Sequence, residues 1–278
     1  MFIRSILLAS TVLALSVPAV ALACDMCDKK MCKEKMCMSG GKGHGDMNHG
    51  GMDHGTWGYS GKKGPAFWGE MDAANNACTQ GKAQSPINVA QFMKGDLPDI
   101  AFAYQDIPLK VKNTGHSVEV TVPPGSTATI GEHVYDLKQI HFHTPSEHYM
   151  DGAPYPMEAH LYHTDPEGHT DVIAVMIKVG GENTTIGQIW SRIPAEAGAE
   201  EVSEEGVVIS AYDLLPASPG YYTYEGSLTT PPCTEGVTWT IMQQPIEITQ
   251  EQLGAFQSIF AHNARPLQDL NGRVVKGD

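Results

Sequence analysis

Three histidines in two short segments have the spacing of a metal site. His141 and His143 are separated by one residue, and His160 follows seventeen residues later. Residues at i and i+2 of a β-strand lie on one face, so one strand presents the first two imidazoles together. A third imidazole from a neighbouring strand completes a three-nitrogen set that leaves one tetrahedral position of Zn²⁺ open. A water bound there ionises near neutral pH and becomes a nucleophile.

Polar residues precede two of these histidines on the same predicted strand face. Gln139 stands two residues before His141, and Glu158 stands two residues before His160. Metal-bound imidazoles need a hydrogen-bond partner for their second nitrogen, often a carboxylate or an amide. One strand histidine is usually a satisfied core residue, but three with polar neighbours on their own face favour a metal site. His163 faces away from His160, and we interpret it as structural.

Strand-like runs separated by turn residues predict a mainly β fold in a single domain. The runs are 109–111, 116–122, 135–143, 158–163, 172–179, 207–210 and 237–242. The run 172–179 is almost entirely apolar, which is typical of a central strand covered on both faces. Two short peripheral helices are expected, at 184–192 and at 249–261, the second opened by Thr249 as its N-cap.

The first residues have the features of a secretory signal peptide. Arg4 supplies a positive charge, residues 6–15 are apolar, and Ala21-Leu22-Ala23 fits a cleavage site, so residues 1–23 are expected to be removed. This apolar stretch is too short to span a membrane, and no later stretch is long enough. The expected location is periplasmic or secreted. Cys24 would then begin the mature chain and allow a lipid anchor, but the preceding residues favour simple cleavage.

Charge argues against nucleic acid as a partner. The 278 residues are 41% hydrophobic and 18% charged, as in ordinary globular proteins, and the formal net charge is −14. An acidic protein is repelled by a phosphate backbone, so nucleic acid is not an expected ligand.

Residues 24–56 form a tail of unusual composition. They consist mainly of Cys, Met, His, Gly, Lys and Asp, which cannot bury a core, so a disordered tail is expected in the absence of metal. Cys, His and Met are ligands for soft and borderline metals such as Cu(I) and Zn²⁺. A site for extra soft-metal ions and a flexible leader fit this composition equally well. The non-methionine ligands are Cys24, Cys27, Cys32, Cys37, His44, His49 and His54.

Several longer motifs follow one another in the remaining sequence. The main ones are His141-Phe-His143, Ser146-Glu147-His148, Glu158-Ala-His160-Leu-Tyr-His163 and Gly226-Ser-Leu-Thr-Thr-Pro-Pro232. Weaker ones are Trp57-Gly-Tyr59, Gln84-Ser-Pro86, Asn113-Thr-Gly-His116, Trp239 and Asn263-Ala-Arg-Pro266. Residues 57–278 therefore resemble an α-class carbonic anhydrase of the secreted bacterial type. The resemblance implies a large central, mostly antiparallel twisted sheet with zinc in a conical cleft.

The resemblance implies an enzyme that reversibly hydrates CO₂ to bicarbonate and a proton by attack of zinc-bound hydroxide. His141, His143 and His160 would hold the zinc, with Gln139 and Glu158 as their outer partners. Thr229 resembles the residue that accepts a hydrogen bond from the hydroxide and donates one to Glu147, which orients the nucleophile. His116 matches the proton shuttle, because an imidazole has an unperturbed pKa of about 6.5. Tyr59 resembles a residue that orders the water chain to this shuttle.

The resemblance also implies a substrate pocket, to which the present sequence adds two departures. Thr230 lies at the substrate end of the cleft, and the apolar wall for CO₂ comprises Val172, Leu228, Val237 and Trp239. Tyr162 stands where many members have a small valine, so its ring would narrow the cleft or swing aside. Glu119 stands where an amide is common and adds a charge near the proton path.

Two cysteines stand alone in the globular part. In an oxidising compartment, Cys78 and Cys233 favour a disulfide over buried free thiols, and they match a disulfide of many extracellular and bacterial members. Some relatives are dimers, so a homodimer is expected by analogy, and secondary esterase activity is expected of the zinc site. The alternative functions are a periplasmic metal-binding protein that acts through its tail and a catalytically idle binding protein.

Overall fold

One large sheet forms the framework of the domain. The computed structural model describes residues 57–198 and 202–278, with the expected signal peptide and tail outside them. The sheet contains β2 (Met93–Lys94), β3 (Ile100–Ala103), β4 (Asp106–Asn113), β5 (Val118–Thr121), β6 (Thr127–Ile130), β7 (His133–His143), β10 (Met157–Thr164), β11 (Thr170–Val179), β12 (Val202–Ser210), β13 (Tyr221–Ser227), β14 (Glu235–Met242), β15 (Ile246–Ile248) and β16 (Lys276–Gly277).

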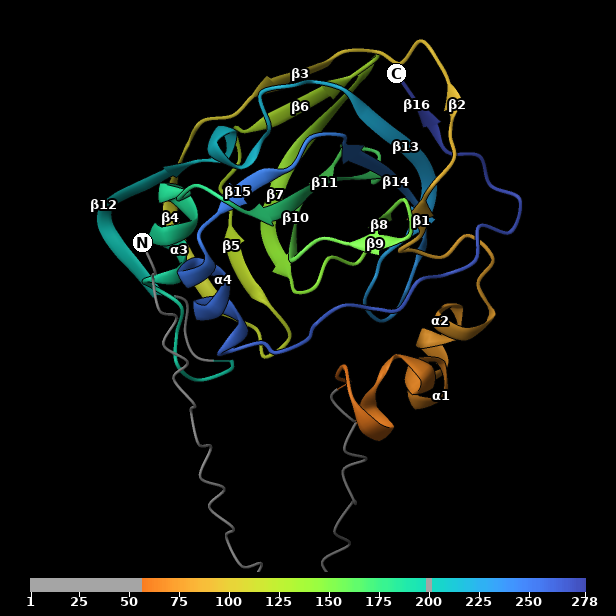
Figure 1. Cartoon of the computed structure of the whole chain (residues 1–278), viewed down its shortest axis with the longest axis horizontal. Coiled ribbons are helices and arrows are strands. Elements are labelled where there is room, and N and C mark those ends of the chain that lie inside the picture. Colours follow the sequence, from red (N-terminus) through yellow and green to blue (C-terminus); the bar gives the residue numbers. More distant parts are fainter. Residues whose placement is uncertain (1–56, 199–201) are drawn as a thin grey trace, which may run out of the picture. The chain divides into compact units, whose positions relative to one another are not determined.

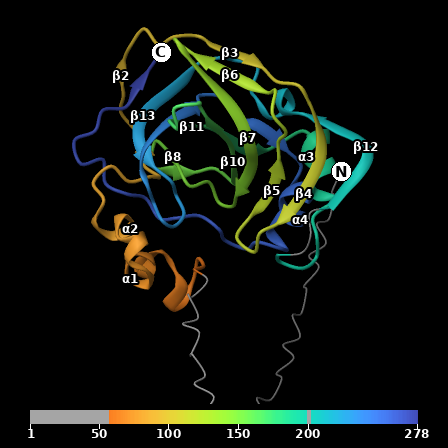
Figure 2. The same ribbon diagram turned by 180° about the vertical axis from the view of Figure 1, so that it is seen from behind.

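The strand order is mixed but mostly antiparallel. It runs β12-β4-β5-β7-β10-β11-β14-β13-β16-β2, with β15 beside β11 and with β6 pairing with both β3 and β7. Parallel pairs occur where β11 meets β14 and β15 and where β16 meets β2. Figures 1 and 2 show β7, β10 and β11 in the middle of the domain, with β12 toward one edge and β2 toward the other. The expectation of a mainly β domain with a large central sheet is confirmed.

Short elements surround the sheet. A small sheet comprises β1 (Asn88–Val89), β8 (Tyr149–Met150) and β9 (Ala153–Pro154). The helices are α1 (Trp68–Met71), α2 (Ala77–Gln80), α3 (Thr184–Trp190) and α4 (Gln250–Gln257), with 3₁₀ turns at Gly61–Lys63, Pro65–Phe67, Ala73–Asn75 and Ala211–Leu214. Figure 1 shows α1 and α2 together and α3 beside α4 elsewhere on the domain. Within the described ranges, no helix is long and apolar enough to cross a membrane.

Strand β11 divides two apolar clusters because its successive side chains point to opposite faces. Ile173 and Val175 belong to the cluster that contains Phe142, whereas Val172 and Ala174 belong to the cluster that contains Trp239. Residues 171–177 are all buried, which confirms the expected central strand. Each fully buried Ile or Val side chain contributes about 1.5–3 kcal/mol, so both clusters hold this strand in place.

The sequence patterns located seven strands of the large sheet and the two longer helices but misplaced some ends, and they missed short strands such as β3 and β6. Thr249 caps α4, and its hydroxyl accepts from the amide of Gln252 in a capping box. The two expected helices end earlier than predicted, at Trp190 and Gln257. Strand β13 was not expected, because its Tyr-Tyr-Thr-Tyr-Glu-Gly-Ser sequence lacks a clear apolar–polar alternation.

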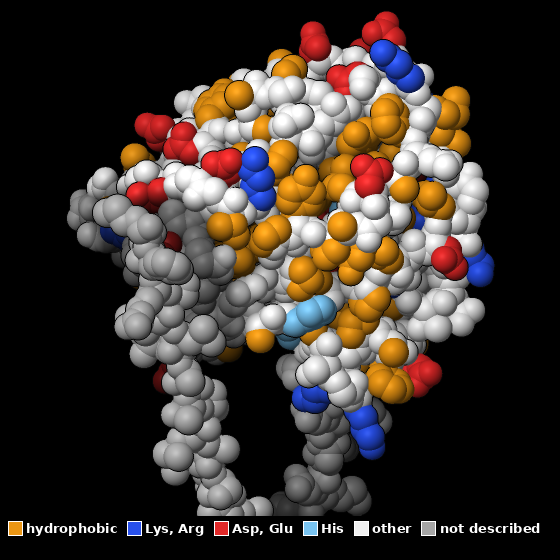
Figure 3. Space-filling view, in the orientation of Figure 1, with side chains coloured by type: hydrophobic (Ala, Val, Ile, Leu, Met, Phe, Trp, Pro, Cys, Tyr) orange, Lys and Arg blue, Asp and Glu red, His pale blue; other side chains and the backbone are white. Residues whose placement is uncertain are grey.

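Apolar side chains also reach the surface. On the face shown in Figure 3 they gather in the middle, and many of the charged groups lie toward the margin. Large exposed apolar side chains of the described domain include Phe92, Met93 and Val274. Apolar surface of this kind is compatible with self-association, and the homodimer stays a prediction.

Candidate metal centre

The three predicted ligands converge because β7 and β10 pair antiparallel. This register places His160 directly opposite His141, and Glu158 opposite His143. The candidate ligand atoms of the three imidazoles lie within 4.8 Å of one another. Nδ1 of His160 is 3.1 Å from Nε2 of His141, and Nε2 of His143 is buried without a hydrogen-bond partner. A buried, unpartnered nitrogen beside two others is a donor set that suits a divalent cation.

The outer nitrogen of each imidazole has an acceptor. Nδ1 of His141 donates to Oε1 of Gln139 at 2.8 Å, and Nε2 of His160 donates to Oε1 of Glu158 at 2.7 Å. These are the two partners that the strand alternation predicts. Nδ1 of His143 donates to the backbone carbonyl of Asn263 at 2.7 Å. These bonds fix the tautomers and leave the inner nitrogens free as ligands.

Burial keeps the ligand set in the protonation state that a metal requires. Burial lowers the pKa of His141 well below 6.5, and its neighbours His160 and His143 lower it further. Burial also lowers the pKa of His143, against the opposing charge of Glu147. Neutral imidazoles keep the lone pair that binds a cation. For Glu158, burial alone would raise the pKa, but His148 and His160 outweigh it and hold the pKa well below its ordinary value.

A hydrogen-bond chain behind the centre holds Glu158 in place. Its Oε1 also accepts from Nδ1 of His148 at 2.7 Å, and its Oε2 accepts from the His148 amide at 2.8 Å. The chain continues from Nε2 of His148 to the Tyr224 hydroxyl and then to Ser85. Both oxygens of this carboxylate are therefore committed, so Glu158 fixes the ring of His160.

Two hollows of about 220 Å³ each meet at the histidines. Gln139, His141 and Thr230 border both. The apolar hollow is otherwise lined by His160, Tyr162, Val172, Leu228, Thr229 and Trp239. The polar hollow is otherwise lined by Trp57, Tyr59, Thr114, His116, Ser117, Glu119 and His143.

The arrangement separates the predicted site residues into two groups. The apolar hollow gathers the predicted CO₂ wall with one exception. Val237 is buried in the cluster beside Val172 and Trp239 and does not line the hollow. The polar hollow gathers His116 and Tyr59 with the departure Glu119.

Comparison with known proteins agrees with this geometry. Residues 63–277 match the family described as eukaryotic-type carbonic anhydrase. A carbonic anhydrase of Neisseria gonorrhoeae is 40% identical over 221 residues, covering 79% of this chain and 86% of the relative. One of Pectobacterium carotovorum is 39% identical over 220 residues, covering 79% and 89%. The chain belongs to the α-class carbonic anhydrase family.

A solved structure supports the same assignment. The α-carbonic anhydrase of Thermovibrio ammonificans, in complex with the inhibitor sulfanilamide, matches with a TM-score of 0.76 and 40% identity, covering 80% of this chain and 98% of that chain. The protein is therefore a carbonic anhydrase, a carbonate dehydratase that hydrates CO₂. Its histidine triad is consistent with a zinc site.

In this carbonic anhydrase, Glu147 points a free carboxylate oxygen toward the metal centre. Its Oε1 accepts from the Arg265 amide at 2.8 Å. Its Oε2 is 3.5 Å from Nε2 of His143 and accepts no hydrogen bond from any described residue. This oxygen is the acceptor that the expected bond from Thr229 requires, and that bond stays a prediction. Thr229 itself is buried at the wall of the apolar hollow.

His116 lies at the outer end of the polar hollow of the carbonic anhydrase. Its ring stacks on Trp57, with centroids 3.7 Å apart and planes 11° from parallel. It also borders an outer hollow of about 560 Å³ that contains His262. Burial lowers the pKa of His116. Burial also raises the pKa of Tyr59 well above 10.0, helped by the charge of Glu147, so this phenol stays protonated.

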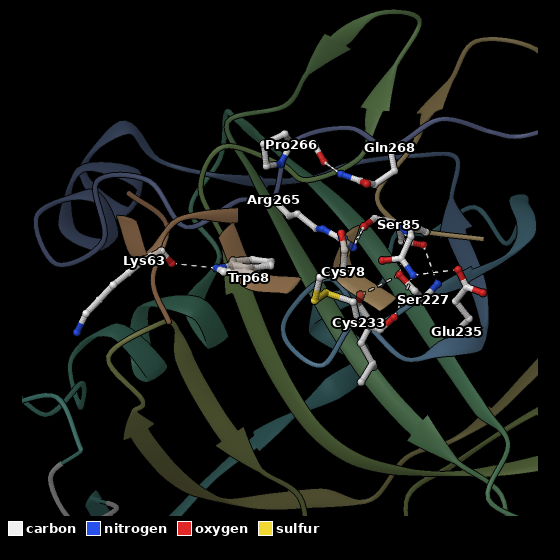
Figure 4. The surroundings of a disulfide bond; sticks show 12 residues. Lys63, Trp68, Cys78, Ser85, Ser227, Cys233, Glu235, Arg265, Pro266 and Gln268 are labelled. Carbon is white, nitrogen blue, oxygen red and sulfur yellow. Dashed lines mark hydrogen bonds between the residues drawn. A yellow bond between two sulfur atoms is a disulfide. The ribbon is translucent and has the colours of Figure 1, made fainter. Parts of the chain in front are cut away.

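The predicted disulfide is confirmed, and it ties the threonine loop to the N-terminal segment. Cys78 in α2 is bonded to Cys233, which follows Thr230 closely (Figure 4). The Cys233 amide donates to the Thr230 carbonyl at 2.8 Å, and Nη2 of Arg265 donates to the Cys78 carbonyl at 3.0 Å. Because this disulfide closes a long loop, it should stabilise the folded domain by about 3–5 kcal/mol, mainly by lowering the entropy of the unfolded chain.

Proposed function

We propose that this carbonic anhydrase hydrates CO₂ at a zinc ion held by His141, His143 and His160. The observation that carries the proposal is the convergence of three imidazole nitrogens whose opposite nitrogens are all hydrogen-bonded. Zinc favours such a nitrogen set, and when bound it lowers the pKa of a coordinated water to about 7. The remaining steps belong to side chains of the two hollows.

The apolar hollow suits CO₂ as substrate. CO₂ is uncharged, linear and weakly hydrated, so it loses little solvation when it contacts the apolar wall formed by Val172, Leu228 and Trp239. This wall lies beside His141 and His160, so CO₂ resting there is close to the site of attack. Bicarbonate is charged and favours water, so the same wall promotes its release.

Thr229 and Glu147 orient the attacking oxygen in this proposal. The Thr229 hydroxyl accepts one hydrogen bond from that oxygen and donates its own proton to Glu147. The buried, unpartnered Oε2 of Glu147 supports this assignment, because buried carboxylate oxygens are normally paired with a hydrogen-bond donor. A preorganised bond of this kind fixes the lone pair that attacks carbon without reorganisation during the reaction.

His116 receives the proton that each hydration releases. It lies at the boundary between the polar hollow and the outer hollow, so its imidazole faces both the centre and the solvent side. Tyr59 borders the same two hollows and supports an ordered water path. A pKa below 6.5 suits rapid release of the proton to buffer at neutral pH.

A CO₂ hydration assay on purified protein, with metal analysis, tests the proposed function. One zinc per chain is expected in the domain, with activity lost on dialysis against a strong chelator and restored by Zn²⁺. Because residues 24–56 also contain ligands, the zinc count is made on protein that lacks them as well. Fast hydration by protein from which the zinc has been removed would refute the zinc assignment.

A second proposal concerns the tail, which lies outside the described residues. We propose that residues 24–56 bind soft or borderline metal and take no part in CO₂ hydration. The support is their four cysteines, three histidines and six methionines. Deleting the tail should leave hydration unchanged and reduce the Cu(I) and Zn²⁺ capacity. Unchanged metal capacity after the deletion would leave only the spacer interpretation.

Export is also proposed from sequence features alone. Arg4, the apolar residues 6–15 and Ala21-Leu22-Ala23 support removal of residues 1–23 and a periplasmic or secreted location. Mass spectrometry of the mature N-terminus would distinguish an unmodified Cys24 from a lipid-modified one. An intact first residue, Met1, would contradict export by cleavage.

A further inference from the structure

Tyr162 contributes a large aromatic ring to the wall of the apolar hollow. It follows His160 by two residues on β10 and therefore shares its face. In the sheet it pairs with Gln139 on β7 and with Val172 on β11, both of which line the same hollow. The phenol ring is therefore placed among the residues that would surround CO₂, next to a metal ligand.

The ring is held in this position by both its apolar and its polar parts. It is half-buried and packs against the cluster that contains Val172 and Trp239. Its hydroxyl is 3.4 Å from Oγ1 of Thr170, the residue at the start of β11. A ring anchored at two points does not leave the hollow without losing apolar burial. The Thr170 contact directs the hydroxyl along the strands away from His160, so the ring borders the hollow on the side away from this ligand.

The small volume of the hollow determines which substrates fit beside this ring. The whole apolar hollow measures about 220 Å³, shared by the ligand face, the threonines and the apolar wall. A triatomic substrate needs little of that space, whereas the carbonyl of an ester brings an acyl group and an alcohol group with it. A hydrophobic pocket discriminates between ligands that differ by one methylene group by factors of roughly 10–200.

We propose that Tyr162 is a size filter that admits CO₂ and restricts hydrolysis of carboxylic esters at the same centre. The proposal rests on the proposed function, because both reactions use the same nucleophile. In ester hydrolysis the oxygen of water adds to the carbonyl carbon, the bond to the alcohol oxygen breaks, and that oxygen takes a proton from the water. The reaction needs no other reagent, so an ester that fits the hollow can react at the same centre.

Ester and CO₂ kinetics of three proteins test the filter. The probe is 4-nitrophenyl acetate, which yields acetic acid and 4-nitrophenol, and the proteins are wild type, Tyr162→Val and Tyr162→Phe. Tyr162→Val should raise kcat/KM for the ester by roughly tenfold or more relative to kcat/KM for CO₂. Tyr162→Phe keeps the ring and loses only the hydroxyl, so it should keep the wild-type ratio.

The outcomes separate this inference from the proposed function. Slow CO₂ hydration by the wild type would overturn the proposed function whatever the ester rates are. Fast CO₂ hydration with the same ester-to-CO₂ ratio in Tyr162→Val would overturn the filter alone. Zinc content and melting temperature are measured for each protein, and Tyr162→Leu replaces the valine variant if that variant does not fold. Xenon binding in crystals gives a readout independent of catalysis: a new xenon site at the vacated ring position is expected in the smaller variant.

Discussion

The two hollows that meet at the histidine triad have the same size but different lining residues. Strands β10, β11 and β14 supply the apolar one with Tyr162, Val172 and Trp239. The polar one takes Glu119 from β5 and His116 from the turn before it, and its aromatic side chains from the N-terminal segment. The difference shows how one centre serves an uncharged substrate and a mobile proton: both hollows border His141 on the same face of the sheet, and each adds side chains of its own.

Removal of a ligand shared by both hollows should have the largest effect. His141→Ala takes away one of the three converging nitrogens, and the proposed function then predicts loss of zinc and a fall of CO₂ hydration to the uncatalysed background. Stopped-flow hydration and metal analysis measure the two losses. His169→Ala is the matched control, because that imidazole is exposed beside the β10–β11 turn. Near-normal hydration by the His141 variant would show that the triad does not hold the catalytic metal.

A change confined to the wall of the apolar hollow should spare the metal. Thr229→Ala removes the proposed orienting hydroxyl, so kcat/KM for CO₂ should fall by roughly two orders of magnitude, as for loss of one preorganised hydrogen bond. The zinc content should stay the same. Thr229→Ser restores a hydroxyl and should recover most of the rate. An unchanged kcat/KM in the alanine variant would remove Thr229 from the mechanism.

A change confined to the polar hollow should affect the proton and not CO₂. His116→Ala should lower kcat in dilute buffer by about tenfold or more, while kcat/KM for CO₂ changes little because proton release follows the CO₂ step. In the wild type, kcat limited by the shuttle should rise with pH through a pKa below 6.5, since the neutral imidazole accepts the proton. Imidazole in the buffer should rescue the variant. A variant rate that does not depend on buffer concentration would contradict the shuttle.

The sequence was sufficient for the hydrogen-bond partners of two histidines and for the disulfide. Strand alternation placed Gln139 and Glu158 beside their histidines, and two isolated cysteines indicated the disulfide. The carbonyl of Asn263 was missed as a partner of His143, because a backbone acceptor can come from any residue type. The stacking of Trp57 on His116 joins segments distant in sequence, and no local pattern encodes such a contact.

The sequence also could not show which residues of a strand face line the hollow. Val237 has the residue type and the strand of a wall residue, yet it is buried in the cluster of Val172 and Trp239 and does not line the hollow. Alternation gives the face of a strand on which a side chain lies, but the exposed part of that face depends on how neighbouring strands twist and pack. The division into an apolar and a polar hollow therefore required the structure.

The smallest predicted effect concerns the face of the sheet that points away from the apolar hollow. Asp171 precedes Val172, so it faces away from the apolar hollow. It is buried, its Oδ2 accepts from Thr240 at 3.0 Å, and its Oδ1 has no partner among the described residues. Burial raises its pKa from 3.8 to about 7, against the Thr240 hydrogen bond and with the help of Glu225. Asp171→Asn should therefore change stability and leave CO₂ hydration unchanged.

The sign of the effect follows from proton binding. Between pH 3.8 and about 7 the folded protein keeps a proton on Asp171 that the unfolded chain has lost. Through this group the free energy of unfolding therefore falls as pH rises through that window, and it levels off above it. Asp171→Asn cannot ionise, so its stability advantage over the wild type should be small near pH 4.5 and grow to a few kcal/mol by pH 8, a gain of on the order of 10 °C in Tm. Asp136→Asn, at a more exposed site, should show no such growth. An equal difference in Tm at both pH values would mean that Asp171 is not held protonated, and any loss of hydration would show that the far face of the sheet influences the site.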